Sequence, residues 1–229
     1  MLLWIICSLT PQEVREKIQC GDSDFIKSLI DYLESTSKGE FLTGTMSTIE
    51  GNVNLAKVEP GYIDPTQTLA SKPPPLCKNC SKVGCSRCTK QDEWWKSVFA
   101  TETDDLLLKS NVHTCSSGFK KNGEIMKNKD YVGCLNNKWK KCKARFPRTI
   151  LKETKVDIES GRIDLKKLEP FINTYNPLLT FVLRCNTDVT CLHSGTAVKA
   201  VVAYVSDYIS KYGLKTHVIF DTIRNIYNR

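Results

Sequence analysis

The distribution of cysteine constrains the fold of this chain more than any other feature of its sequence. The chain has 229 residues and 11 cysteines, an odd number. Since no secretory signal is evident, metal binding is expected rather than a disulfide framework. Cys7 and Cys185 lie in apolar runs and are expected to be small buried side chains. Six others lie in stretches rich in Lys, Asn and Ser: Cys77, Cys80, Cys85, Cys88, Cys134 and Cys142.

Two sets of residues have the composition of a zinc site. In "CKNCSKVGCSRC" two C-x-x-C pairs can each bend around one ion, and together they supply Cys77, Cys80, Cys85 and Cys88. Only four residues separate the pairs, so one tetrahedral site is tight, and each pair can instead take ligands from elsewhere. The second set has one imidazole and three thiols, which suit a zinc ion. They are His113, Cys115, Cys134 and Cys142. The alternative for both sets is incidental reduced thiols.

The charge of the chain favours an anionic partner. The formal net charge is +8, and residues 120–148 contain ten Lys or Arg and only two acids. The stretch "NKWKKCKARFPR" places aromatic rings among six of these cations, a pattern typical of single-stranded nucleic-acid binding. The predicted contacts are Lys138, Trp139, Lys140, Lys141, Lys143, Arg145, Phe146 and Arg148. The alternative is a solvated basic loop without a partner.

Hydrophobic periodicity predicts alternating helices and strands around a long irregular middle. "TPQE" provides a capping box for the first helix. Helices are predicted over 11–18, 23–35, 91–110, 196–212 and from 221. Strands are predicted over 1–9, 176–186 and 215–220, with loops over 36–75 and 111–149.

The predicted helix over 196–212 carries two tyrosines on one face. Tyr204 and Tyr208 are four residues apart, which separates them by only about 40° on a helix, and Lys211 follows. An apolar stripe of Val198, Val202, Val205 and Ile209 can anchor the helix while both phenols face a cleft. The tyrosines can therefore be nucleophiles, with Lys211 as a nearby cation. The alternative is simple packing at the edge of a core.

Several segments resemble the N-terminal replication-initiator (Rep) region of Helitron-type transposases found in fungal genomes. They are "CKARFPR", "FINTYNPLLTFVLRCNTDVT", "SGTAVKAVVAYVSDYISK" and "LKTHVIFDTIRNIY". The resemblance implies an HUH-type nuclease with an antiparallel sheet, in which a His pair binds Mg or Mn. Tyrosines matching Tyr204 and Tyr208 would attack single-stranded DNA and form a 5′-phosphotyrosine. A helicase would normally follow, and the family role implies a nuclear location.

The sequence departs from this family in two respects. The His-hydrophobic-His pair, expected just before "MLLWI", is missing, and there is no G-x-x-x-x-G-K-[ST] loop. We therefore expect a fragment of the transposase that binds single-stranded DNA and is inactive alone. The alternatives are a zinc-dependent nucleic-acid-binding module without catalysis and a cysteine-rich protein-interaction domain. No membrane segment or small-molecule substrate is expected, and the sequence does not indicate an oligomeric state.

The expected fold class is α/β (α+β): a partial HUH-nuclease antiparallel sheet with flanking helices and an irregular cysteine-rich, zinc-binding insertion. Four segments are expected. Residues 1–35 and 150–229 would form the partial Rep domain, 36–75 a linker, and 76–149 the basic region that binds zinc and nucleic acid.

Overall fold

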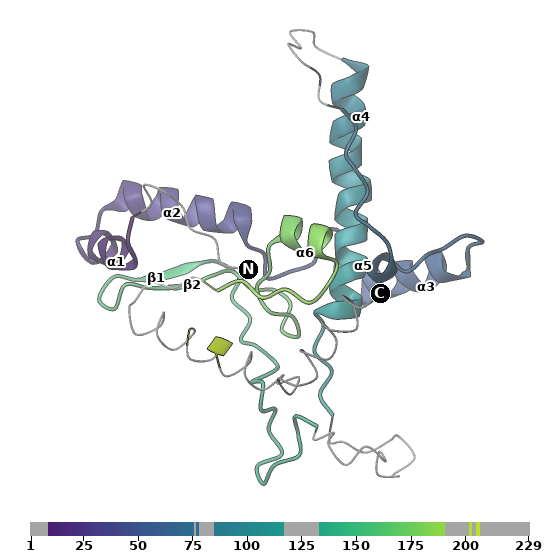
Figure 1. Cartoon of the computed structure of the whole chain (residues 1–229). Coiled ribbons are helices and arrows are strands. Elements are labelled where there is room, and N and C mark those ends of the chain that lie inside the picture. The colour runs from purple at the N-terminus through teal and green to yellow at the C-terminus, as the bar shows by residue number, and fades with distance from the viewer. Residues whose placement is uncertain are drawn as a thin grey trace, which may run out of the picture. The chain divides into compact units, whose positions relative to one another are not determined.

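The computed structural model describes residues 9–75, 77, 85–116 and 133–190, together with residues 202, 205 and 206. The chain divides into two compact units, of which the larger comprises residues 27–156 and 163–190. The elements in chain order are α1 (Pro11–Gln19), α2 (Ser23–Thr36), α3 (Met46–Val58), η1 (Pro65–Gln67), α4 (Ser86–Trp94), η2 (Trp95–Phe99), α5 (Ala100–Ser110), β1 (Lys155–Asp157), β2 (Arg162–Asp164) and α6 (Pro177–Leu183) (Figure 1).

The first two helices agree with the sequence prediction. Thr10 and Glu13 form the predicted reciprocal capping box at the start of α1, where Pro11 occupies the first turn. The Glu13 carboxylate accepts the Thr10 backbone N–H at 2.7 Å. Ile18 is fully buried on the inner face of α1. In α2 the predicted apolar face is only partly covered, and Leu33 is its buried residue.

Residues 36–75, predicted to be an irregular linker, instead contain α3 and η1. Thr45 caps α3 by accepting the Thr48 N–H, and Ile49 and Val53, four residues apart, are its buried side chains. The apolar stripe is short and is interrupted by Gly51 and Asn52, which explains why the sequence shows no sustained helical period here.

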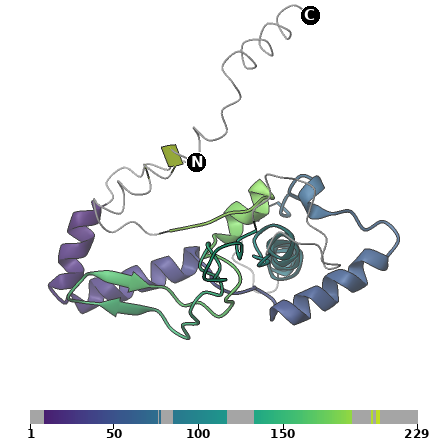
Figure 2. The same cartoon turned by 90° about the horizontal axis from the view of Figure 1, so that it is seen from below.

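The predicted helix over 91–110 begins earlier, at Ser86, and runs without a break through α4, the π-helical η2 and α5. Figure 2 looks along this helix, with α3 and α6 packed on different sides of its α5 end. Within η2, Trp95 and Phe99 make an edge contact with ring centroids 4.9 Å apart. Phe99 in turn packs on Phe181 of α6 at 5.0 Å.

The apolar run over 176–186, predicted as a buried strand, contains a helix instead. Asn176 accepts the Leu179 N–H and Pro177 occupies the first turn, so the flanking residues expected to bound a strand are helix-start signals. Arg184 ends α6 in the left-handed conformation. The buried side chains of α6 are Thr180 and Phe181, whereas Leu178 and Val182 are exposed.

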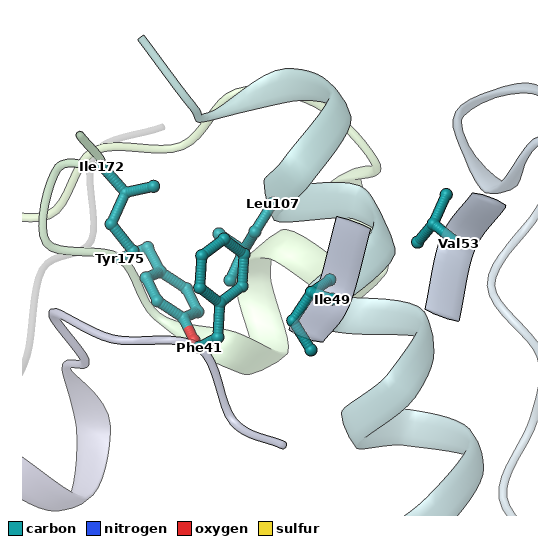
Figure 3. Close-up of a cluster of buried hydrophobic side chains, with 6 residues drawn as sticks. All are labelled: Phe41, Ile49, Val53, Leu107, Ile172 and Tyr175. Atoms are coloured by element: carbon teal, nitrogen blue, oxygen red, sulfur yellow. The ribbon is translucent and has the colours of Figure 1, made fainter. Parts of the chain in front are cut away.

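The core of the larger unit lies where α3, α5 and the segment before α6 meet (Figure 3). Its buried residues are Phe41, Ile49, Val53, Leu107, Ile172 and Tyr175. The Tyr175 hydroxyl donates to the Glu40 carbonyl at 2.9 Å, and burial raises the pKa of this phenol. Beside this core, the buried Asp104 carboxylate accepts the N–H groups of Leu42 and Thr43 at 2.7 and 2.8 Å. Burial raises the pKa of Asp104, although these donors favour its charged form.

The fold is mixed, with helices and one small antiparallel sheet of β1 and β2 within the described ranges. Residues 1–8 of the predicted strand 1–9, the predicted strand 215–220 and the helix from 221 lie outside the described residues. Of the predicted helix over 196–212, residues 202, 205 and 206 are described and are helical. Val202 and Val205 are exposed, which contradicts the predicted burial of their stripe at these two positions. Among the helices described, none combines the length and apolarity that a bilayer span requires.

The packing of Leu107 predicts how strongly the core depends on it. Leu107 is fully buried, whereas Leu55 on α3 is 69% exposed. We expect Leu107→Ala to lower the free energy of unfolding by about 3 kcal/mol, because it removes buried apolar surface and leaves a cavity. Leu55→Ala should change it by less than about 0.5 kcal/mol. Urea unfolding at constant zinc concentration measures the free energy of unfolding of both variants. Equal decreases in the two variants would show that Leu107 is not part of the core.

Candidate metal centre

The first two ligands of the candidate centre follow directly after α5. Asn111 ends this helix, and its side-chain amide donates to the Thr187 carbonyl at 2.8 Å. Val112 packs against the hydrophobic core. The His113 N–H donates to the Phe171 carbonyl at 2.8 Å. These contacts fix the backbone from which His113 and Cys115 project.

The other two ligands lie on a loop, residues 133–148, that contains neither helix nor strand. The Leu135 N–H donates to the Ser116 carbonyl at 2.9 Å, which fastens the start of the loop beside Cys115. The Lys143 N–H donates to the Cys134 carbonyl at 3.0 Å, which brings Cys142 back toward Cys134. Lys140 and Arg145 adopt positive φ angles of 52° and 62°, so the loop turns sharply on both sides of Cys142.

The four predicted ligands meet. The ligand atoms of His113, Cys115, Cys134 and Cys142 all lie within 4.8 Å of one another. His113 Nε2 is 3.4 Å from Cys134 Sγ and 3.3 Å from Cys142 Sγ. In a tetrahedral zinc site, bond lengths of about 2.0 Å to nitrogen and 2.3 Å to sulfur place these atoms about 3.5 Å apart. The cluster can therefore hold a metal ion such as zinc with little rearrangement.

The thiols of this cluster influence one another's protonation. Burial, with the neighbouring Cys142 and Cys134 thiols, raises the pKa of Cys115 to about 11. The pKa of Cys142 is lowered: burial opposes its thiolate, but the N–H groups of Phe146 and Ala144 and the Cys115 thiol favour it more. A bound cation would stabilise all three thiolates, since metal ligation requires the deprotonated sulfur.

Phe146 and Arg148, predicted to contact nucleic acid, contact the candidate centre and the residues beside it. The Phe146 ring stacks on the His113 imidazole with centroids 4.3 Å apart and an interplanar angle of 12°. The Arg148 guanidinium lies 4.5 Å from the centroid of the Phe146 ring and donates to Asn173 Oδ1 at 2.9 Å. These contacts hold the ligand ring in place.

The remaining predicted nucleic-acid contacts are exposed. They are Lys138, Trp139, Lys140, Lys141, Lys143 and Arg145. Five cations and one ring are therefore available to solvent on the stretch that runs from one Cys ligand to just beyond the next.

A second group of thiols lies at the start of α4. The Sγ atoms of Cys77, Cys85 and Cys88 are within 4.8 Å of one another, and those of Cys77 and Cys85 are 3.7 Å apart. Two thiolates on one tetrahedral zinc ion are expected about 3.8 Å apart. Cys80, the fourth predicted ligand, lies outside the described residues.

Of the other predicted residues, Cys185 is described. Tyr204, Tyr208 and Lys211 lie outside the described residues, as does Cys7. Cys185, predicted to be buried, is exposed, because α6 ends at Leu183 and turns this residue outward.

One polar network was not predicted from the sequence, because half of it lies on the supposed linker. The Tyr62 hydroxyl donates to Asp105 Oδ2 at 3.0 Å, and Lys109 pairs with Asp105 at 2.9 Å and with Asp64 at 3.4 Å. Lys109 also contacts the Tyr62 hydroxyl. Although burial opposes its charge, hydrogen bonds to Tyr62 and Asp105 raise the pKa of Lys109, and burial raises that of Tyr62. Neither side chain is thereby activated as a nucleophile.

This network lies beside a cavity of about 640 Å³ between α3, α5 and the chain around η1. Ile49, Val53, Ile63 and Val98 supply apolar walls, and Asp104 and Asp105 contribute acidic groups.

Zinc content tests the first cluster. Cys134→Ser and Cys142→Ser each remove a thiolate from the shell, so each variant should bind about one zinc ion fewer per chain than the unmodified protein. Cys20→Ser and Cys185→Ser are matched controls, because both thiols are exposed and belong to neither cluster. Elemental analysis after gel filtration measures the molar ratio of zinc to protein. Equal zinc content in all four variants would contradict a metal site at this cluster.

No protein-family model matches this chain, and no curated protein or solved structure is detectably similar to it. Any function of the candidate centre must therefore be inferred from its own residues. These are one imidazole, three thiols and the cationic loop that carries two of those thiols.

Proposed function

We propose that the chain is a zinc-supported module that binds single-stranded DNA. The observation that carries this proposal is the position of Trp139 on the loop between Cys134 and Cys142. Its ring is 68% exposed, although tryptophan is usually buried. The ligands fix both ends of the segment that presents this ring. A ring that is fixed and accessible can stack on an unpaired base.

The surroundings of Trp139 favour a nucleic acid over an apolar protein surface. Lys138 Nζ lies 4.4 Å from the centroid of the indole ring, so a cation accompanies the stacking face. The backbone N–H of Trp139 donates to Asn137 Oδ1 at 3.1 Å, which stabilises the turn that carries the ring. Lys140, Lys141, Lys143 and Arg145 extend the positive charge along the loop. These cations would neutralise the phosphates of a single-stranded nucleic acid whose base stacks on Trp139.

The resemblance to Helitron Rep regions supports a more specific form of the proposal, in which the chain is a fragment of a rolling-circle transposase and acts in the nucleus. Its tyrosines would be Tyr204 and Tyr208, with Lys211 beside them. The residues do not fit the divalent metal of such a nuclease, since His113, His193 and His217 form no His-hydrophobic-His pair. His113 is instead within reach of three thiols. We therefore assign DNA binding, and no cleavage, to this chain.

Trp139→Ala tests the stacking contact. Its removal should weaken binding to a single-stranded oligonucleotide about 5- to 100-fold, since one base–aromatic stack contributes about 1–3 kcal/mol. Tyr32→Ala is a matched control, because this ring is 56% exposed and belongs to α2 rather than to the basic loop. Fluorescence anisotropy measures both affinities. An unchanged affinity in Trp139→Ala would contradict the proposal.

The salt dependence of the same binding tests the cations. If the five exposed cations of the loop neutralise phosphates, log Kd should rise with log salt concentration with a slope of about 3.5 for a single strand. Binding without salt dependence would contradict this role of the cations and would favour the alternative function, a cysteine-rich protein-interaction domain.

Incubation with Mn²⁺ and labelled single-stranded DNA tests the absence of cleavage. No covalent adduct should form, because the chain contains no His-hydrophobic-His pair to hold the metal that would polarise the phosphate. Denaturing gel electrophoresis detects an adduct directly. An adduct that disappears in Tyr204→Phe or Tyr208→Phe would show that the chain retains nuclease activity.

A further inference from the structure

The two thiol clusters lie at opposite ends of one continuous helix. Cys85 and Cys88 lie at the start of α4, and His113 and Cys115 follow the end of α5. The helix from Ser86 to Ser110 has 25 residues in α4, η2 and α5. At about 1.5 Å per residue its ends are about 37 Å apart. Figure 1 shows α4 extending away from α3 and α6, which pack on α5.

The first turn of α4 lacks the aromatic packing on α6 that Trp94 provides at the other end of α4. None of the residues of α4 is buried, and Cys85, its N-cap residue, makes no side-chain capping hydrogen bond. A helical turn without burial or a cap is marginal in water. Cys85 and Cys88 meet Cys77 there, so a metal ion would tie the preceding chain to the first turn and perform the role of the missing cap.

The chain around the second cluster has the same charge pattern as the loop of the first. Residues 65–91 contain five cations and no acid: Lys72, Lys78, Lys82, Arg87 and Lys90. Arg87 and Lys90 are exposed on α4. Residues 138–148 contain six cations and no acid. The chain that leads into α4 and forms its first turn is therefore cationic, like the loop of the first cluster, and Asp92 and Glu93 follow later on α4.

We propose that single-stranded nucleic acid contacts both ends of this helix, with Arg87 and Lys90 on α4 forming the second contact surface. This inference rests on the proposed function and adds a length requirement to it. A strand stacked at about 3.4 Å per nucleotide needs about 11 nucleotides to span 37 Å. Strands shorter than this reach one end, and longer strands reach both, so the second contact becomes intramolecular and adds avidity.

The experiment is a length series of oligothymidylates of 6, 12, 18 and 24 nucleotides, measured by anisotropy at fixed salt. Affinity of the unmodified protein should rise at least about tenfold from the shortest to the longest strand, since the second contact is tethered. In the double variant Arg87→Gln/Lys90→Gln the rise should fall to about threefold or less, the remainder coming from extra binding registers. Its affinity for the 6-nucleotide strand should not change.

The matched control removes two exposed cations elsewhere in the same unit, Lys57→Gln/Lys152→Gln. This control should keep the full rise with length. The salt slope for the 24-nucleotide strand should also fall by about 1.4 in the α4 double variant, because two fewer phosphates are neutralised.

The outcomes separate the two proposals. Binding of the unmodified protein to none of the strands would overturn the proposed function. Binding with the same affinity at every length, or a rise with length that survives Arg87→Gln/Lys90→Gln, would overturn the second contact and leave the proposed function intact. Zinc content and helix content of both double variants verify that each remains folded.

Discussion

In the described part of the chain, one imidazole and three thiols meet and bring together two segments on which the proposed function depends. His113 and Cys115 follow the end of a helix whose last turns are packed in the core, whereas Cys134 and Cys142 belong to a loop with no helix or strand. A hydrogen bond contributes about 1 kcal/mol net, and a structural zinc ion about 10–16 kcal/mol in small domains. With a bound metal ion, the few backbone hydrogen bonds that reach the loop would therefore be secondary to metal ligation in holding it.

This arrangement divides the aromatic and cationic residues of the loop between two tasks. The Phe146 ring stacks on His113, and the Arg148 guanidinium lies over the Phe146 ring. Both side chains therefore help to position the His113 ligand. Trp139 and Lys138 pair with each other at the tip of the turn and face solvent. A metal ion bound by these ligands would therefore order the loop while the Trp139 ring stays exposed to solvent. A bound metal ion would pre-organise this proposed binding surface, so a strand would not need to order the loop when it binds.

Sequence patterns predicted the features that depend on local chemistry. The capping box of α1 requires only Thr10 and Glu13, three residues apart, and it formed as predicted. The four ligands of the first cluster were identified because thiols in a polar, cationic stretch cannot be explained by a core.

Features decided by tertiary packing were not predicted. The run "NPLLTFVLRCN" is compatible with a buried strand or a helix, and its packing against α5 selects the helix. The helix α3 has only Ile49 and Val53 buried, so its pattern is too short to stand out. The Tyr62–Asp105–Lys109 network joins residues more than forty positions apart, which no local pattern reveals. The stacking of Phe146 on His113 likewise depends on the fold of the loop.

The most direct measurement is amide hydrogen exchange of residues 133–148 with zinc present and after its removal by a chelator. If the metal holds the loop, the amides of Leu135, Lys143 and Arg145 should lose their protection when zinc is removed. The amides of Leu107 and Tyr175, whose side chains are in the core, should keep theirs. Loop amides that remain equally protected without zinc would contradict the account.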